Sequence, residues 1–345
     1  MQKKNVNRRM LLKQAAYAGG VLAMSSSGAR RSEAAENLKS RIGLALYTVR
    51  DIMATDFEGV LAKVAQIGYK EVEPANGYNK LEAKSFRALL DRYGLSMPST
   101  HTNYPEAGAE LERQLEAQQI MGIRYTEIRT GPPRPASAVP VRPAAALELG
   151  AYFNPGTGKT NNSFTELGAF GPYQPPVTLD TTKRRAATLN ANGKIAHKFG
   201  IKLFVHNHTG EFERLSDDDR SEYDVLLAET DPDLVTMQLD IAWACIAGKD
   251  PIQLFKANPG RYELWHIKDV FGLKTVNQAL SPNQRTQSMA FAPVGAGQID
   301  YKRIFAEADV AGMKHFFVEQ DNAASFGDSL AAAGVSYKNL STILS

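Results

Sequence analysis

The chain of 345 residues contains a single cysteine, Cys245, and carries a net charge of only +3. One cysteine excludes an internal disulfide bond and any zinc site built from several cysteines. Several of the basic residues stand near the N-terminus, so no strongly basic surface is expected elsewhere. The sequence therefore argues against nucleic acid or an anionic membrane as a partner.

Two further features are missing after the N-terminal region. No apolar run beyond residue 24 approaches the roughly 20 residues that a membrane-spanning helix needs. The segment 47–51 follows the first strand-type run and contains no glycine. A doubly wound dinucleotide-binding fold would place a glycine-rich loop there. We therefore expect no stable membrane span once the N-terminal signal described next is removed, and no fold of the dinucleotide-binding type.

Residues 1–35 have the features of an export signal. Arg8 and Arg9 are followed by apolar residues, and the stretch 14–24 is apolar but rich in Ala and Gly. This arrangement is typical of twin-arginine signals, and small residues near position 35 suit cleavage. We predict twin-arginine export to the periplasm, with residues 41–345 forming the folded domain. A basic tail or an uncleaved anchor is the alternative.

From residue 41 onwards, short β-type runs alternate with amphipathic helix-type stretches. The expected strands are 42–47, 70–73, 96–101, 124–128, 202–206, 235–240, 262–266 and 315–319. The expected helices are 57–67, 81–93, 110–121, 182–199, 221–229, 251–256, 301–308 and 329–344. Apolar residues in the helices recur at three- and four-residue intervals, and Gly68 and Gly312 stand where helices should end. Eight strand–helix units predict an α/β protein with a (β/α)8 TIM barrel.

The interval 131–179 breaks this alternation, because it is long and crowded with Pro, Gly, Ser and Asn. Loops of such length are usually functional or disordered insertions. Since the segment follows the C-terminal end of the fourth strand, we expect it at the mouth of the barrel, where it could act as a lid.

Four of the expected strands end in a residue that can bind a divalent cation: His206, Asp240, His266 and Glu319. The C-terminal ends of the strands of a parallel barrel converge on one mouth, so these side chains are predicted to meet. Mixed imidazole and carboxylate ligation suits Mn, Co, Zn or Mg. The sequence therefore predicts an enzyme that depends on one divalent metal ion.

The motifs at the strand ends resemble the xylose isomerase-like TIM-barrel superfamily. Its members include sugar isomerases and epimerases, inosose dehydratases and family-2 AP endonucleases. The resembling segments are 46–51, 68–73, 205–208, 239–243, 266–269, 293–300 and 318–321. Within the superfamily, the match is to proteins labelled sugar phosphate isomerase/epimerase. The resemblance implies a carbohydrate isomerase or epimerase that abstracts a proton next to a metal-polarised carbonyl.

The resemblance also implies which residues hold the metal. Three ligands carry over onto Asp240, His266 and Glu319, and the fourth falls on His206, where many relatives have Glu. The epimerases of the family use two metal-site glutamates on opposite faces of the sugar, so an imidazole here favours a reaction that needs one base. A periplasmic keto-glycoside lyase or dehydratase is therefore the alternative function. Glu211 is the nearest acid or base that could replace the missing glutamate. Alternatively, it lies behind a ligand residue or faces solvent.

Further residues near the strand ends are assigned to catalysis or substrate binding. The catalytic candidates are Glu319, Glu211, Lys268 and His208, and the substrate-binding candidates are Tyr47, Glu73, His101 and Trp243. Lys268 shares the strand face of His266 and would bind an oxyanion or phosphate, or else lie in solvent as a loop residue. For the substrate-binding candidates, structural hydrogen bonding or core packing is the alternative.

Two other functions stay open at this point. An AP endonuclease-like enzyme would need more metal ligands and a basic track for DNA. A non-catalytic sugar-binding relative would show disrupted ligand positions. The expected partner is a small carbohydrate, and assembly into a homo-oligomer stays open.

Overall fold

The computed structural model describes residues 36–74, 81–102, 109–128 and 177–345. The predicted signal segment 1–35 lies outside the described residues, and so does the expected insertion 131–179 apart from its last three positions.

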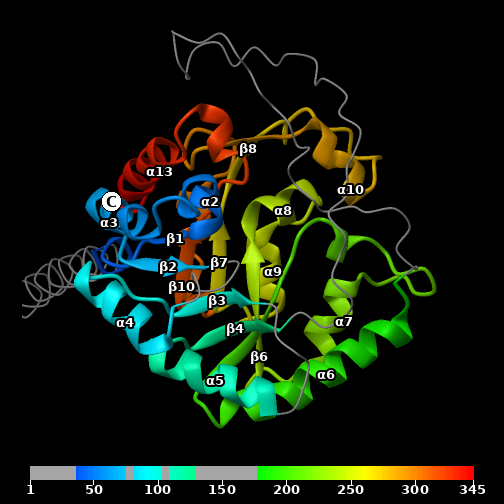
Figure 1. Ribbon diagram of the computed structural model, residues 1–345. Coiled ribbons are helices and arrows are strands. Elements are labelled where there is room, and N and C mark those ends of the chain that lie inside the picture. Colours follow the sequence, from blue (N-terminus) through cyan, green and yellow to red (C-terminus); the bar gives the residue numbers. More distant parts are fainter. Residues whose placement is uncertain (1–35, 75–80, 103–108, 129–176) are drawn as a thin grey trace, which may run out of the picture.

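Eight parallel strands form a ring in the centre of the molecule, surrounded by helices (Figure 1). Their bounds are β1 (Gly43–Ala45), β2 (Glu71–Glu73), β3 (Ser99–Thr102), β4 (Tyr125–Ile128), β5 (Lys202–His206), β6 (Val235–Asp240), β7 (Leu264–Ile267) and β10 (His315–Val318). The order around the sheet is β2-β1-β10-β7-β6-β5-β4-β3. A parallel bridge between Glu71 and Ser96 connects β2 to the segment before β3 and closes the ring. The predicted (β/α)8 barrel is therefore confirmed.

The helices cover the outside of the barrel, and α13, the last helix, lies beside α3 (Figure 1). Their bounds are α2 (Arg50–Met53), α3 (Phe57–Ile67), α4 (Ala83–Arg92), α5 (Ala109–Met121), α6 (Leu179–His197), α7 (Glu222–Glu229), α8 (Ile241–Ile246), α9 (Pro251–Ala257), α10 (Pro282–Arg285), α11 (Tyr301–Phe305), α12 (Ala308–Ala311) and α13 (Ser329–Ile343). Within the described ranges, no helix combines the length and apolar character that crossing a membrane requires.

Local sequence signals explain where several helices begin and end. Asp56 caps α3 by accepting a hydrogen bond from the backbone N–H of Gly59 at 3.0 Å. Asp300 caps α11 in the same way. Gly312 follows α12 with φ of 79°, a left-handed conformation that glycine adopts without strain. After Gly312 the chain runs into β10, so this helix ends where the sequence predicted.

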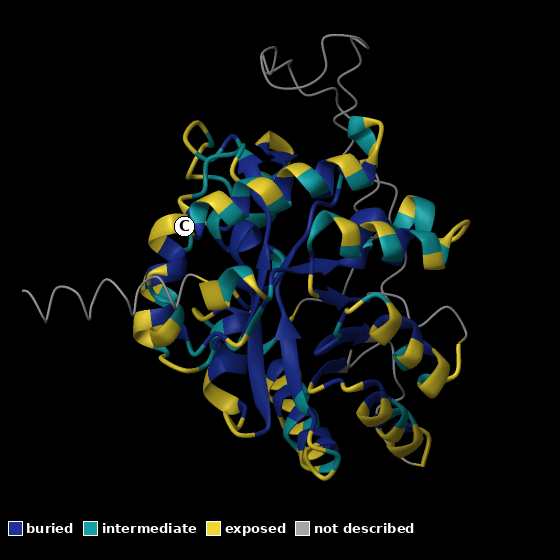
Figure 2. Ribbon diagram, turned by 90° about the vertical axis from the view of Figure 1, so that its left-hand side faces the viewer, coloured by how far each residue is buried: buried dark blue, intermediate teal, exposed yellow. Residues whose placement is uncertain are grey.

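Alternation along the strands separates two apolar regions. Leu203 and Val205 of β5 belong to the main core between barrel and helices, whereas Phe204 belongs to a small separate cluster. We call that cluster the barrel belt; its members are Ala45, Tyr125, Phe204, Leu264 and Phe317. In Figure 2 the strands are mostly buried, and the long helices have buried residues on one side and exposed residues on the other. Side chains two positions beyond the belt share its inward face but lie nearer the C-terminal mouth.

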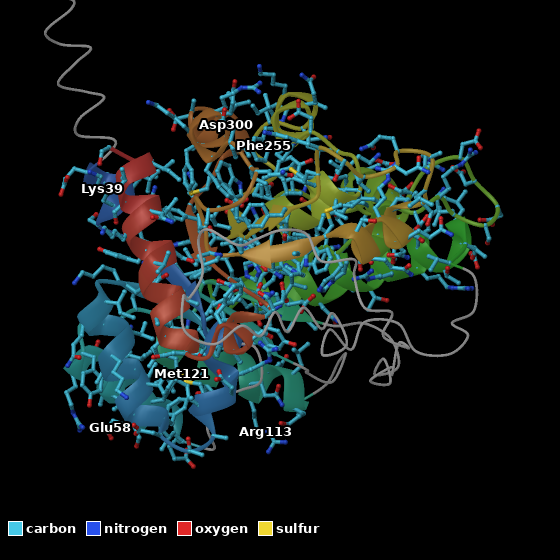
Figure 3. All side chains as sticks on the ribbon, turned by 90° about the horizontal axis from the view of Figure 1, so that it is seen from above. Lys39, Glu58, Arg113, Met121, Phe255 and Asp300 are labelled. Carbon is cyan, nitrogen blue, oxygen red and sulfur yellow. The ribbon has the colours of Figure 1, made fainter. Side chains whose placement is uncertain are left out.

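Figure 3, which views the molecule from above, shows side chains filling the space between the ribbons. Glu58 of α3 and Arg113 of α5 lie at the periphery. The N-terminal end of the barrel has its own polar contacts. Lys202 Nζ lies 2.6 Å from Glu263 Oε1, and His315 Nδ1 lies 2.8 Å from Glu71 Oε2. The belt therefore separates these two contacts from the polar residues at the mouth.

The structure contains an antiparallel ribbon that the sequence did not predict. β8 (Asp269–Phe271) pairs with β9 (Ala290–Ala292) in the loop that follows β7. Strands of three residues are too short to show a clear period-two pattern, which is why periodicity missed them. Val270 and Phe291 of the ribbon pack with Trp243 in a third apolar cluster. The helix expected at 301–308 is divided into α11 and α12.

Candidate functional site

The residues at the mouth are placed by their spacing from the barrel belt. His206, His266 and Glu319 each stand two positions after a belt residue on the same strand or its extension. Because side chains two apart on a strand point the same way, all three are directed inward. All three are buried, as is Asp240 at the end of β6. The convergence of strand ends predicted from the sequence is therefore present.

Among the described residues, two overlapping groups of side chains could hold a metal ion, and they share His266. Asp240, His266 and Glu319 form one group; His101, His206 and His266 form the other. The ligand atoms of each group lie within 4.8 Å of one another. His206 adjoins His266, with ring centroids 4.8 Å apart. The four predicted ligands are thus brought together, but as two groups with a common imidazole rather than one.

The first group has the donor set and the atom positions of a cation site. His266 Nδ1 lies 2.6 Å from Glu319 Oε2 and 3.9 Å from Asp240 Oδ2. Both atoms are buried, and each has a charged or ionisable neighbour: Glu319 Oε2 beside His266 Nδ1, and Lys268 Nζ at 3.1 Å from Asp240 Oδ2. The other oxygen of Asp240, Oδ1, caps α8 by accepting the backbone N–H of Trp243 at 3.0 Å. Two carboxylates and an imidazole converging in this way fit a hard or borderline divalent ion.

Glu73 supports His266 from the side opposite to Glu319. Its Oε2 contacts His266 Nε2, and its Oε1 accepts hydrogen bonds from Ser99 Oγ and, at 2.8 Å, from Gln238 Nε2. Glu73 was predicted to touch substrate, with structural hydrogen bonding as the alternative. The described contacts correspond to the alternative, because they occupy both carboxylate oxygens. A carboxylate behind a ligating histidine fixes its tautomer and orientation.

His101 belongs to the same network. Its Nδ1 lies 3.0 Å from Glu127 Oε2, and its Nε2 lies 2.8 Å from Gln238 Oε1. His206 Nδ1 contacts the same Gln238 oxygen at 2.9 Å. Burial opposes the charged imidazolium, but the charges of Glu73 and Glu127 outweigh this effect and raise the pKa of His101 to about 10. In the described structure, His101 therefore links the side chains of Glu127 and Gln238.

Sequence reasoning missed Gln238 and Glu127, which connect the two metal-capable groups to the rest of the barrel. Gln238 stands two positions before Asp240 on β6, and Glu127 lies on β4 opposite His101 in the sheet register. The signal was available, since both occupy inward positions of predicted strands. Their residue types alone did not distinguish them from ordinary polar residues.

Lys268 lies at the centre of a set of carboxylates. Its Nζ is 3.1 Å from Asp240 Oδ2, 3.0 Å from Glu319 Oε2 and 2.9 Å from Asp321 Oδ2. The side chain is 1% exposed, so the alternative of a solvated loop lysine is wrong. Burial disfavours the ammonium, but these carboxylates outweigh it and hold the pKa of Lys268 above its usual value. The amine is therefore a buried positive charge next to two candidate metal ligands.

The charges of the candidate ligands differ from their solution values. Burial raises the pKa of Asp240 to about 6, against the opposing influence of Lys268. Burial also lowers the pKa of His206 well below its usual value, which leaves the neutral imidazole able to bind a metal. For His266, burial is outweighed by Glu319 and the other nearby carboxylate, and the pKa rises to about 9. Metal binding would therefore compete with protons on His266 and Asp240.

The remaining predicted residues line the mouth or stand behind it. His208 is half-buried two residues after the end of β5, and its ring centroid is 5.6 Å from that of Trp243. Trp243 is 4% exposed and packs in the apolar cluster under the β8–β9 ribbon. Glu211, in the 3-10 turn that follows, accepts the backbone N–H of His208 at 2.7 Å. Tyr47 lies on a 3-10 turn rather than in a strand, with the Arg50 guanidinium 4.0 Å from its ring centroid.

Asp269, which directly follows Lys268, holds the loop 293–299 in place. Its carboxylate accepts backbone N–H groups of Gly295 at 2.9 Å, Gly297 at 3.0 Å and Ile299 at 3.1 Å. A side chain at Gly297 would collide with this carboxylate, so the close approach requires glycine. Residues 266–269 thus contain a candidate metal ligand (His266), a buried ammonium (Lys268) and a side chain that anchors a loop (Asp269).

The sequence profile of one protein family, described as xylose isomerase-like TIM barrel, matches residues 141–335, more than half of the chain. The chain belongs to this family. An inosose dehydratase of Geobacillus thermodenitrificans is 30% identical over 141 residues, which are 39% of this chain and 46% of that protein. The match thus spans about half the length of that relative. An inosose dehydratase of Lacticaseibacillus casei is 24% identical over 280 residues, 77% of this chain and 83% of that protein.

Solved structures agree on the fold. A sugar phosphate isomerase/epimerase from Parabacteroides distasonis superposes with a TM-score of 0.61 over 88% of this chain and 93% of that chain, at 19% sequence identity. At that identity the likeness establishes the barrel and its order of elements. It leaves the substrate and the reaction to be argued from the site itself.

Proposed function

We propose that this protein is a divalent-metal-dependent carbohydrate enzyme that abstracts a proton next to a carbonyl group. The observation that carries the proposal is the buried group of Asp240, His266 and Glu319, whose ligand atoms lie within 4.8 Å of one another. Such a group at the C-terminal ends of barrel strands occupies the position where TIM-barrel enzymes perform catalysis. Mn, Co, Zn and Mg all suit its mixed nitrogen and oxygen donors.

In this proposal Asp240, His266 and Glu319 hold the ion, and His206 is the fourth donor beside them. When bound, the ion polarises the carbonyl of the substrate and makes the neighbouring C–H group more acidic. Glu73 keeps the His266 ring in the orientation that directs Nδ1 toward the other ligands. The residues of the chain thus supply a preorganised, buried site before substrate arrives.

His208 and Glu211 are the proposed acid–base residues. His208 is less buried than His206, and their ring centroids are 4.9 Å apart. Glu211 is held on the same turn through its hydrogen bond from the His208 backbone N–H. One of these side chains would take the proton from carbon, and the other would give a proton to the departing oxygen as the carbon–oxygen bond breaks. Lys268 and Trp243 would form the inner wall against which the sugar lies.

We favour elimination, as in a lyase or dehydratase, over isomerisation or epimerisation. Epimerisation needs two proton-transfer groups on opposite faces of the substrate, and at the first ligand position this chain has His206 rather than a carboxylate. Glu73 is a poor second base, because both its oxygens contact buried side chains. The relatives named inosose dehydratase support the same choice. We therefore propose a keto-cyclitol, keto-sugar or 3-keto-glycoside as substrate.

The decisive experiment is a proton-exchange assay in deuterated water with the metal-loaded protein. NMR would follow keto-cyclitols, 3-keto-glycosides and simple sugars. Deuterium uptake next to the carbonyl together with loss of water or aglycone would support the lyase. Uptake together with an epimer or an aldose–ketose pair would support an isomerase. No exchange with any of these substrates after metal loading would contradict the enzyme proposal.

We also propose that residues 1–35 direct export to the periplasm. The support is the paired Arg8 and Arg9 ahead of an Ala- and Gly-rich apolar stretch. A folded fluorescent reporter fused behind these residues should reach the periplasm in a host with the twin-arginine pathway. Replacing both arginines by lysine should keep it inside the cell. Unchanged distribution in that variant would argue against the assignment.

A further inference from the structure

We infer that Lys268 is an internal counter-cation that shares Asp240 and Glu319 with the metal ion. Without metal, its ammonium neutralises these two carboxylates; on metal binding, it gives them up and keeps its pairing with Asp321. The inference rests on the proposed metal centre and adds a competition between the ion and the lysine of this chain.

The same oxygen atoms serve both cations. Asp240 Oδ2 and Glu319 Oε2 lie with His266 Nδ1 in the metal-capable group, and they also lie 3.1 and 3.0 Å from Lys268 Nζ. An ion bound to those oxygens at the usual distance of about 2.1 Å would lie very close to the ammonium. Two positive charges so close together in a buried place repel each other strongly. The two cations therefore cannot both use these oxygens as they stand.

Burial explains why the chain needs a counter-cation. Asp240, Glu319 and Asp321 are buried next to one another. Unpaired carboxylates in such surroundings are strongly destabilising. Lys268 is the lysine or arginine that contacts all three in the described structure. It allows the ligands to remain ionised and correctly placed before the metal arrives.

The surroundings also offer the ammonium a second position. Asp321 Oδ2, at 2.9 Å, lies outside the metal-capable group. The rings of Trp243 and Phe291 have centroids 5.4 and 5.8 Å from Nζ, within the range of cation–π attraction. The Lys268 backbone is fixed, because its carbonyl accepts a hydrogen bond from the Tyr301 hydroxyl. Only the flexible side chain has to move.

The test measures Mn²⁺ affinity by electron paramagnetic resonance and thermal stability of the full chain with and without Mn²⁺. The variant Lys268→Met removes the ammonium while keeping a side chain of similar length. We expect its Mn²⁺ affinity to rise about tenfold or more, the scale of changes beside metal ligands. Its melting temperature without metal should fall, and Mn²⁺ should restore it. Lys202→Met is the matched control, because Lys202 pairs with Glu263 at the other end of the barrel.

Asp321 provides a second, milder variant. Asp321→Asn removes the alternative partner of the ammonium, so it should weaken Mn²⁺ binding in the wild-type background. In the Lys268→Met background the same change should have a much smaller effect, which separates competition from a simple loss of negative charge. Equal losses in both backgrounds would overturn the inference, even if Lys268→Met itself proved too unstable for a melting curve.

The outcomes distinguish this inference from the proposed metal centre. If the wild type binds Mn²⁺ and Lys268→Met binds it equally or more weakly, the inference fails and the metal centre stands. If only Lys268→Met binds Mn²⁺, the counter-cation is supported and the metal-dependent function is contradicted. If neither protein binds, both are refuted.

Discussion

The Glu73 carboxylate contacts Nε2 of His266 across the barrel, although 193 residues separate them in the chain. The other nitrogen of His266 faces Glu319 and Asp240. One imidazole is thus held between a supporting carboxylate and a group of candidate ligands. This arrangement is the one by which proteins orient histidines toward metals.

The first prediction concerns that supporting contact. Glu73→Gln should reduce metal affinity about 10- to 100-fold, the usual effect of losing a carboxylate behind a ligating histidine. The amide has nearly the shape of the carboxylate but lacks its charge. Isothermal titration with Mn²⁺ or Zn²⁺ would measure the change.

Glu71→Gln is the matched control for Glu73→Gln. Glu71 lies on the same strand and also pairs with a histidine, His315, but at the N-terminal end of the barrel. We expect its metal affinity to equal that of the wild type. Similar losses in both variants would show that the effect on Glu73 is a general weakening of the fold.

The second prediction tests the ligands themselves. Asp240→Ala and His266→Ala should each abolish metal retention and turnover. Because Asp240 also caps α8, Asp240→Asn is the cleaner variant: the amide oxygen can keep the cap at Trp243 while the ionic ligand is lost. Elemental analysis of the purified proteins would measure bound metal. Wild-type metal content and activity in Asp240→Asn and His266→Ala would refute the site.

The third prediction is the pH dependence of metal binding. The metal-free pKa values are about 9 for His266 and about 6 for Asp240, and both groups must lose a proton to bind an ion. Apparent affinity should therefore rise about tenfold per pH unit between about pH 6 and 9, and more steeply below about pH 6. Titrations in buffers of different ionisation heat would also detect the released protons. An affinity that is constant over this range would contradict the assignment.

The fourth prediction concerns stability rather than binding. The pKa of His101 is raised to about 10 in the folded protein, compared with about 6.5 for an unperturbed histidine. Folding therefore takes up a proton between these values. The resulting stability is complete below about pH 6.5 and is lost as pH rises toward 10. Urea unfolding of metal-free protein should show this decline, up to about 1.4 kcal/mol per pH unit for one group.

His101→Gln should make that decline shallower, because the variant lacks one of the two histidines that take up a proton on folding; His266, whose pKa is raised to about 9, accounts for the part that remains. His197→Gln is the control, since His197 is exposed on α6 and should leave the pH profile unchanged. If His101→Gln follows the wild-type curve between pH 6.5 and 10, the buried His101 is not the source of the effect.

Much of the architecture follows from the sequence because it depends on local signals. Strand ends at His206, Asp240, His266 and Glu319 are visible as apolar runs terminated by ligand-type residues. Caps such as Asp56 and glycines such as Gly312 mark the helix boundaries. Eight repeats of these signals are compatible with few folds other than a parallel barrel. The direction of inward side chains then follows from the two-residue period of a strand.

Only the tertiary structure decided which side chains each of these inward residues contacts. Glu73 and His101 have residue types suited to substrate contact, but their neighbours are set by strands far away in the chain. The burial of Lys268 among three carboxylates was likewise invisible locally, because a lysine after a strand is usually solvated. The local sequence determines which side chains of a strand point inward and where each strand and helix ends. Which charges meet inside the barrel is determined by the closure of the sheet.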